Sequence, residues 1–208
     1  KSPGQVRMSP NYREIAIGFK PFFFHLLTNT PMAEIVKHPH LPLNEVIHDS
    51  YVRKLEEGLH RSANDHQVLS TIENFLSKNI IEKRFDNRLL HTMDLIYSKK
   101  IYNVDQLSES VNLSSVALRK IFHKGIGWSP KQVAKILRFN RVIKSYNPNE
   151  QVDYQNLIYD NGYYDQSHLI REFREILGIT PKQYFENKKL TFDFYNYNRW
   201  TGDIFALK

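Results

Sequence analysis

The chain has 208 residues, and its 29 Lys and Arg residues exceed its 22 Asp and Glu residues, which gives a formal net charge of +7. It contains no cysteine, so disulfide scaffolds, thiolate metal sites and cysteine nucleophiles are excluded. No apolar run approaches the roughly 20 residues that a membrane helix requires, and the N-terminus lacks the basic-then-apolar layout of a signal peptide. We therefore expect a soluble, cytoplasmic protein without a membrane partner.

The N-terminal part of the sequence predicts a helical segment cut from a longer protein. The chain begins at Lys1 rather than Met, and residues 12–19 alternate in the way that is typical of a half-buried strand. Thr30-Pro31 indicates a helix start, with Thr30 as the N-cap and Pro31 at the first helical position. Apolar residues at helical spacing predict one helix within residues 43–60 and another within residues 64–78.

Basic residues concentrate in the middle of the chain. Residues 114–144 contain eight Lys and Arg residues and neither Asp nor Glu. Because unpaired like charges repel one another, this stretch favours contact with a polyanion over a merely solvated surface. The eight residues are Arg119, Lys120, Lys124, Lys131, Lys135, Arg138, Arg141 and Lys144.

Residues 86–187 read as a string of short helices in which one pattern occurs twice. Each copy has a short helix, a tight turn and a second helix, and then a Gly followed by a Ser-Pro or Thr-Pro helix start. Asn112 suits the turn of the first copy because Asn tolerates the left-handed conformation. In the second copy Gly162 lies in the turn, and Gly178 caps the second helix. Ser129-Pro130 starts a linking helix that ends near Tyr146.

The second helix of each copy is expected to have an apolar face and a polar face. In the first copy the inward residues are Leu118, Ile121 and Phe122, and the outward residues are Arg119, Lys120 and His123. In the second copy the inward residues are Leu169, Ile170 and Phe173, and the outward residues are Gln166, Ser167, His168 and Arg171.

The second copy also carries a family signature in its order and spacing: Asn161-Gly162-Tyr163, Asp165-Gln166-Ser167-His168-Leu169, Arg171-Glu172-Phe173 and Gly178-Ile179-Thr180-Pro181-Lys182-Gln183-Tyr184. Leu113-Ser114, Leu118, Phe122, Gly127 and Ser129-Pro130 fit in the first copy, and Leu137-Arg138-Phe139 fits in the linking helix. With these residues the chain resembles the double helix-turn-helix DNA-binding domain of AraC/XylS-type transcription regulators. Ser108, Val142 and Ile158 depart from small Ala positions of the family, and Ser145-Tyr146 departs from a Leu-Leu pair.

The resemblance implies a mainly α fold with three parts. Residues 86–189 would form a seven-helix domain with two helix-turn-helix units joined by a linking helix. Residues 1–85 would be a fragment of a sensor or dimerisation domain, α-helical with a remnant of β structure, on the likeness of Phe19-Lys20-Pro21 to a strand motif of such domains. Residues 190–208 would be an aromatic tail packed on its own domain.

The resemblance also implies which residues contact double-stranded DNA. The base contacts would be Val116, Arg119 and Lys120 in the first unit and Gln166, Ser167 and Arg171 in the second. Val can touch a thymine methyl group, Arg and Lys can donate to guanine, and Gln can address adenine. The phosphate contacts would be Lys124, Lys131, Lys135 and Arg138, which add affinity without sequence information.

The function implied is transcription regulation through sequence-specific DNA binding, without catalysis, cofactor or metal. A small-molecule effector or a second copy of the chain would act at the N-terminal domain. Two other interpretations stay open. His38-Pro39-His40, with His25 and His48 nearby, could form the metal site of a cupin-like or hydrolytic enzyme. Alternatively, the stripe of Val46, Tyr51, Leu55 and Leu59 could make the N-terminal half a protein-interaction module.

Overall fold

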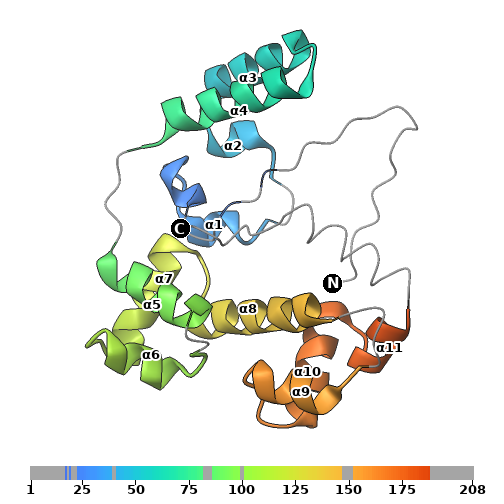
Figure 1. The fold of residues 1–208 in the computed structure, drawn as a ribbon. Coiled ribbons are helices and arrows are strands. Elements are labelled where there is room, and N and C mark those ends of the chain that lie inside the picture. Colours follow the sequence, from blue (N-terminus) through green and yellow to red (C-terminus); the bar gives the residue numbers. More distant parts are fainter. Residues whose placement is uncertain are drawn as a thin grey trace. The chain divides into compact units, whose positions relative to one another are not determined.

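The computed structural model describes residues 17, 19, 23–38, 41–81, 86–98, 101–146 and 152–187. Within them the chain forms one short 3₁₀ helix, eleven α-helices and no strand (Figure 1). The predicted mainly α class is therefore confirmed. The strand predicted over residues 12–19 lies outside the described residues apart from Ile17 and Phe19, and the tail over residues 190–208 lies wholly outside them.

The N-terminal segment contains the 3₁₀ helix η1 (Phe24–Leu26) and four α-helices: α1 (Met32–Ile35), α2 (Leu43–Val46), α3 (Asp49–Arg61) and α4 (Asp65–Asn79). Seven helices follow: α5 (Asn87–Ser98), α6 (Val104–Ser110), α7 (Ser115–Gly125), α8 (Pro130–Ser145), α9 (Tyr154–Asp160), α10 (Gln166–Leu177) and α11 (Pro181–Glu186). No helix in the described part of the chain is long and apolar enough to cross a membrane.

The described residues divide into two compact units, and each unit takes segments from separate parts of the chain. One unit contains residues 93–107 and 131–187, and the other contains residues 19–92 and 108–130. In the first unit, α9, α10 and α11 gather around one end of α8 (Figure 1). Their shared core consists of Phe139, Val142, Ile143, Leu157, Tyr163, Leu169, Phe173, Tyr184 and Phe185.

The turn between α6 and α7 follows the predicted turn chemistry. Asn112 has a φ of 52°, the left-handed value expected for it. Ser114 is the N-cap of α7, and its hydroxyl accepts a hydrogen bond from the Ala117 amide at 3.2 Å. The linking helix α8 begins at Pro130 and ends at Ser145, close to the predicted bounds.

Helices α9 and α10 each have an aspartate as the N-cap. Asp153 accepts from the amides of Gln155 and Asn156 at the start of α9, and Asp165 accepts from the His168 amide at 2.7 Å at the start of α10. The chain leaves α10 through Gly178, whose φ of 77° requires the glycine that the sequence indicated.

In the other unit, the N-terminal helix α1 packs against the turn that follows α7. Gly127 in that turn has a φ of 84°. A Cβ atom built on Gly127 would lie 2.7 Å from the carbonyl carbon of Met32 and 2.9 Å from Cγ1 of Val36. Met32 is only 5% exposed. The backbone of α1 and the turn therefore meet at a distance that no side chain at position 127 would permit.

Two predictions about the N-terminal helices were wrong in their bounds. The helix expected within residues 43–60 is divided into α2 and α3, because the hydroxyl of Thr28 donates to the Val46 carbonyl at 2.6 Å and His48 caps a new helix. Pro31, and not Thr30, is the N-cap of α1. By contrast, α4 agrees with the helix predicted over residues 64–78.

Candidate nucleic-acid interface

Helix α7 separates an apolar face from a polar one. Leu118 and Phe122 are fully buried, whereas Arg119 and Lys120 are exposed. Val116 is 56% exposed. The three residues predicted to contact bases in this helix therefore reach solvent, and His123 is exposed with them.

Helix α10 has the same division. Leu169 and Phe173 are fully buried and pack in the core of the unit, while Gln166, Ser167 and Arg171 are exposed. A shallow groove of about 410 Å³ runs along this helix and includes Ser167 and Arg171. The three predicted base contacts of the second helix pair thus line an accessible surface.

Two tyrosines near α10 were missed in the sequence analysis. Tyr164 precedes the N-cap of α10 and is 91% exposed, and Tyr159 near the end of α9 is 87% exposed. The neighbouring Tyr163 is buried, and burial raises the pKa of its hydroxyl. The adjacent residues Tyr163 and Tyr164 could have indicated an exposed aromatic side chain, because only one of the two packs in the core and the other lies on the surface.

The four predicted phosphate contacts occupy different surroundings. Lys124 and Lys131 are exposed. Lys135 on α8 forms an ion pair with Glu175 on α10, and the hydrogen bond from Lys135 holds the pKa of the Glu175 carboxyl below its usual value. Only 26% of the Lys135 side chain is exposed. The side chain of Arg138 is less exposed than that of Lys135.

Arg138 belongs to a buried polar cluster with Glu172 and His168. The side chains of Arg138 and Glu172 are paired and are 11% and 6% exposed. Nε of Arg138 donates to Oε2 of Glu172 at 3.2 Å, and Nε2 of His168 lies 3.2 Å from Oε1 of Glu172. The guanidinium also lies 5.3 Å from the ring centroid of Tyr102 and 4.8 Å from that of Tyr163, which are cation–π distances.

This cluster changes two interpretations of the sequence. His168 was expected to point away from the core with its neighbours, but its ring turns toward Glu172 on the same helix. Arg138 was expected to hold a phosphate, but its charge is already neutralised by a carboxylate 34 positions later in the chain. Arg141 is similarly engaged, since it donates to the Tyr102 hydroxyl at 3.0 Å and to the Tyr97 carbonyl.

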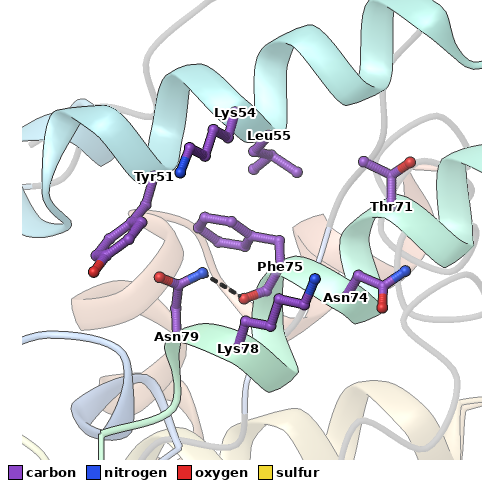
Figure 2. Close-up of a pocket in the computed structure, with 8 residues that line it drawn as sticks. All are labelled: Tyr51, Lys54, Leu55, Thr71, Asn74, Phe75, Lys78 and Asn79. Carbon is purple, nitrogen blue, oxygen red and sulfur yellow. Dashed lines mark hydrogen bonds between the residues drawn. The ribbon is translucent and has the colours of Figure 1, made fainter.

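The N-terminal segment contains a groove between α3 and α4, which lie side by side (Figures 1 and 2). Its volume is about 400 Å³. Phe75 and Leu55 supply apolar surface, while Lys54 and Lys78 bring two positive charges and none of the lining residues is acidic. The amide of Asn79 donates to the Phe75 carbonyl at 2.7 Å.

The residues of the alternative interpretations have other surroundings. Of His38-Pro39-His40, only His38 is described. Nδ1 of His48 accepts a hydrogen bond from the Ser50 amide at 3.3 Å and caps α3. In the part of the chain that the structure describes, no three His, Cys, Asp or Glu side chains gather as metal ligands would.

The apolar stripe proposed as an interaction surface is neither fully buried nor fully exposed. Val46, Leu55 and Leu59 are half-buried, and Tyr51 is 48% exposed. The buried apolar residue of α3 is Val52, which packs with Leu27 and Ile47.

Residues 107–187 match a family model described as a helix-turn-helix domain. The match supports the resemblance of this stretch to AraC-type helix-turn-helix domains. The stretch contains α7 to α11 and most of α6, and therefore all of the predicted base contacts. The match supports a role in DNA-binding transcription regulation. No curated protein and no solved structure matches the chain significantly.

Proposed function

We propose that this protein is a non-enzymatic, sequence-specific transcription regulator that reads adjacent major-groove segments of double-stranded DNA with α7 and α10. The observation that carries the proposal is that each helix exposes polar side chains on the side opposite its buried apolar residues, within the stretch that matches a helix-turn-helix domain. The major groove admits an α-helix, and side chains of such a helix reach base edges there.

The exposed residues suggest a division of labour. Val116 would contact a thymine methyl group, Arg119 or Lys120 would donate to guanine, and Gln166 would address adenine. Ser167 and Arg171 complete the set on α10. Lys124 and Lys131 would hold phosphates, and Lys135 would do so after leaving Glu175. We omit Arg138 from the phosphate contacts because its charge is buried and paired.

Tyr164 joins the proposed interface as a phosphate contact. It lies immediately before the N-cap of α10, and the residue is 91% exposed. Tyrosine hydroxyl groups are among the donors that fix a protein on the DNA backbone. Such a contact would set the depth at which α10 enters the groove.

Control by the N-terminal part, residues 1–85, is the second element of the proposal. The packing of α1 against the turn after α7 supports it, because a shift of α1 would be felt at the end of a DNA-reading helix. The groove between α3 and α4 is the candidate effector site, and its two lysines favour an organic anion. The half-exposed stripe around Tyr51 supports homodimerisation of the same segment.

Fluorescence anisotropy of the chain on duplexes tiled from the upstream region of its own gene, with scrambled competitors and a salt series, tests DNA reading. Sequence-dependent binding that weakens steeply with salt is expected. Salt-sensitive binding without preference would show that specificity needs an effector or a dimer. If no duplex binds even at low salt, the proposed function is wrong.

Control by an effector has its own test. A panel of small mono- and dicarboxylates is titrated into the chain, and DNA affinity is measured with and without each. A carboxylate that binds the wild type but not Lys54→Ala/Lys78→Ala, and that changes DNA affinity, supports the site. Binding that leaves DNA affinity unchanged would contradict the coupling.

A further inference from the structure

The buried cluster of Arg138, Glu172 and His168 joins the linking helix α8 to α10. We propose that it fixes the rotation of α10 on α8, so that Arg138 and Glu172 act as positioning residues for base reading by Gln166, Ser167 and Arg171. This inference rests on the proposed function, since it assumes that α10 reads DNA. It assigns Arg138 a role different from the phosphate contact expected from its charge.

The spacing on α10 connects the cluster to the reading residues. Glu172 directly follows Arg171, and His168 directly follows Ser167. Successive residues of an α-helix are separated by a fixed rotation, with 3.6 residues per turn. Holding Glu172 and His168 against α8 therefore fixes the directions in which Ser167 and Arg171 leave the neighbouring side of the helix.

The apolar core alone does not supply this constraint. Leu169 and Phe173 pack in the same core, and the ring of Phe173 lies 4.9 Å from that of Phe139, the neighbour of Arg138. Apolar burial is non-directional, so it tolerates small rotations of the helix. Hydrogen bonds between a guanidinium and a carboxylate depend on angle and are strongest in a planar arrangement, so they select one rotation.

The cluster also holds the turn that leads into α10. Nη1 of Arg138 lies 3.4 Å from the Gly162 carbonyl, and the Tyr164 amide donates to Nδ1 of His168 at 3.5 Å. Nε2 of His168 lies 3.2 Å from Oε1 of Glu172 and 3.3 Å from Nη2 of Arg138, so the ring contacts both members of the ion pair. The same three side chains therefore set both the rotation of α10 and the course of the backbone at Tyr164.

The test uses the full chain and separates positioning from stability. A buried ion pair can often be replaced by apolar side chains of similar volume without loss of stability. We therefore expect Arg138→Met/Glu172→Met to fold and to unfold at a temperature close to that of the wild type. Its ratio of affinities for cognate and scrambled duplexes should fall about tenfold or more, with unchanged affinity for the scrambled duplex.

The pair Lys135–Glu175 offers a matched control, because it joins the same two helices at a more exposed position. Because Lys135 is itself a proposed phosphate contact, Lys135→Met/Glu175→Met should weaken binding to both duplexes equally and so leave the ratio of affinities unchanged. As a second variant, Arg138→Lys keeps the charge but lacks the planar fork of the guanidinium. It should lower the ratio in the same direction even if the double variant does not fold.

Retention of the wild-type ratio by a folded Arg138→Met/Glu172→Met variant would overturn the inference, as would retention by Arg138→Lys. A wild type that binds no duplex would instead defeat the proposed function, and a wild type that binds without preference would show that specificity needs an effector or a dimer. In either case residual dipolar couplings of the amides of α8 and α10 decide the inference without DNA. An unchanged rotation of α10 about its own axis, relative to α8, in the Arg138 variants would overturn it.

Discussion

Arg119 and Lys131 are both exposed and both positively charged, yet we assign them different roles. Arg119 lies on α7 beside Val116, in the part of a helix that can face base edges, whereas Lys131 lies at the start of α8. Base contacts specify a sequence, while phosphate contacts hold any duplex in register. Charge alone does not separate the two roles, but position on the helices does.

Replacing Arg119 or Gln166 by Ala should weaken binding to the preferred duplex by about 1–3 kcal/mol and leave binding to scrambled DNA unchanged. Each substitution removes hydrogen bonds to one base and no phosphate contact. Lys131→Ala is the matched control, because it should weaken binding to every duplex and lower the salt slope by about 1. Anisotropy over a salt series measures both quantities. Equal losses on preferred and scrambled duplexes for Arg119→Ala or Gln166→Ala would refute the base contacts.

At the scale of single helices, α9 and α10 have the same residue type at the N-cap, but their first turns contain different side chains. Asp153 and Asp165 are both N-caps. The first turn of α10 contains Gln166 and Ser167, which we assign to bases. Fraying at the N-terminus of α10 would therefore reduce the preference for the cognate duplex. Fraying at the N-terminus of α9 would lower only the stability of the fold.

Asp165→Ala and Asp153→Ala should each lower the free energy of unfolding by about 0.5–2 kcal/mol, because each leaves helix amides without an acceptor. Only Asp165→Ala should also reduce the preference for the cognate duplex, since its first turn carries two reading residues. Urea unfolding measures the first effect and anisotropy the second. A similar loss of preference in Asp153→Ala would show that general destabilisation, and not the order of α10, is responsible.

Local signals predicted much of the helical structure. Asn112, Gly178 and the Ser129-Pro130 pair each determine a turn or a helix end through their own backbone chemistry, and the structure agrees at all three. The exposure of Gln166 and Ser167 followed from helical periodicity in the same way. Where a feature depends on neighbouring residues alone, the sequence was sufficient.

Features that depend on distant partners were not predictable from local patterns. The break between α2 and α3 follows a hydrogen bond from Thr28, 18 positions before Val46. The apolar spacing over residues 43–60 continues across the break and hides it. Likewise, the sequence displays the charge of Arg138 but not its pairing with Glu172.

At the scale of the whole molecule, the chain does not assign its N-terminal and C-terminal halves to separate compact units. Residues 19–92 and 108–130 form one unit, so α1 and α7 share it. The contact at Gly127 is the closest point of approach that we describe between them. Coupling between an effector and DNA requires such a shared element, whose arrangement both ligands can bias.

The difference in stability between the variants Gly127→Ala and Gly178→Ala tests the contact between α1 and the turn after α7. Both glycines have positive φ, at 84° and 77°, so either substitution should cost about 1–2 kcal/mol of backbone strain. A Cβ at Gly178 meets nothing within 4 Å, whereas one at Gly127 meets the backbone of Met32. Gly127→Ala should therefore cost about 1–3 kcal/mol more. Equal losses in thermal unfolding would contradict the close contact.

The contact between α1 and the turn at Gly127 has a consequence for chimeric regulators. Fusing residues 86–187 to an unrelated sensor would discard Met32 and Val36, and the backbone at Gly127 would lose the surface that covers it. Exchange at residue 85 would follow the apparent boundary in the sequence but would separate parts of one compact unit. A DNA-binding segment that is moved into a chimera should therefore include α1, because domain exchange succeeds where few contacts cross the junction.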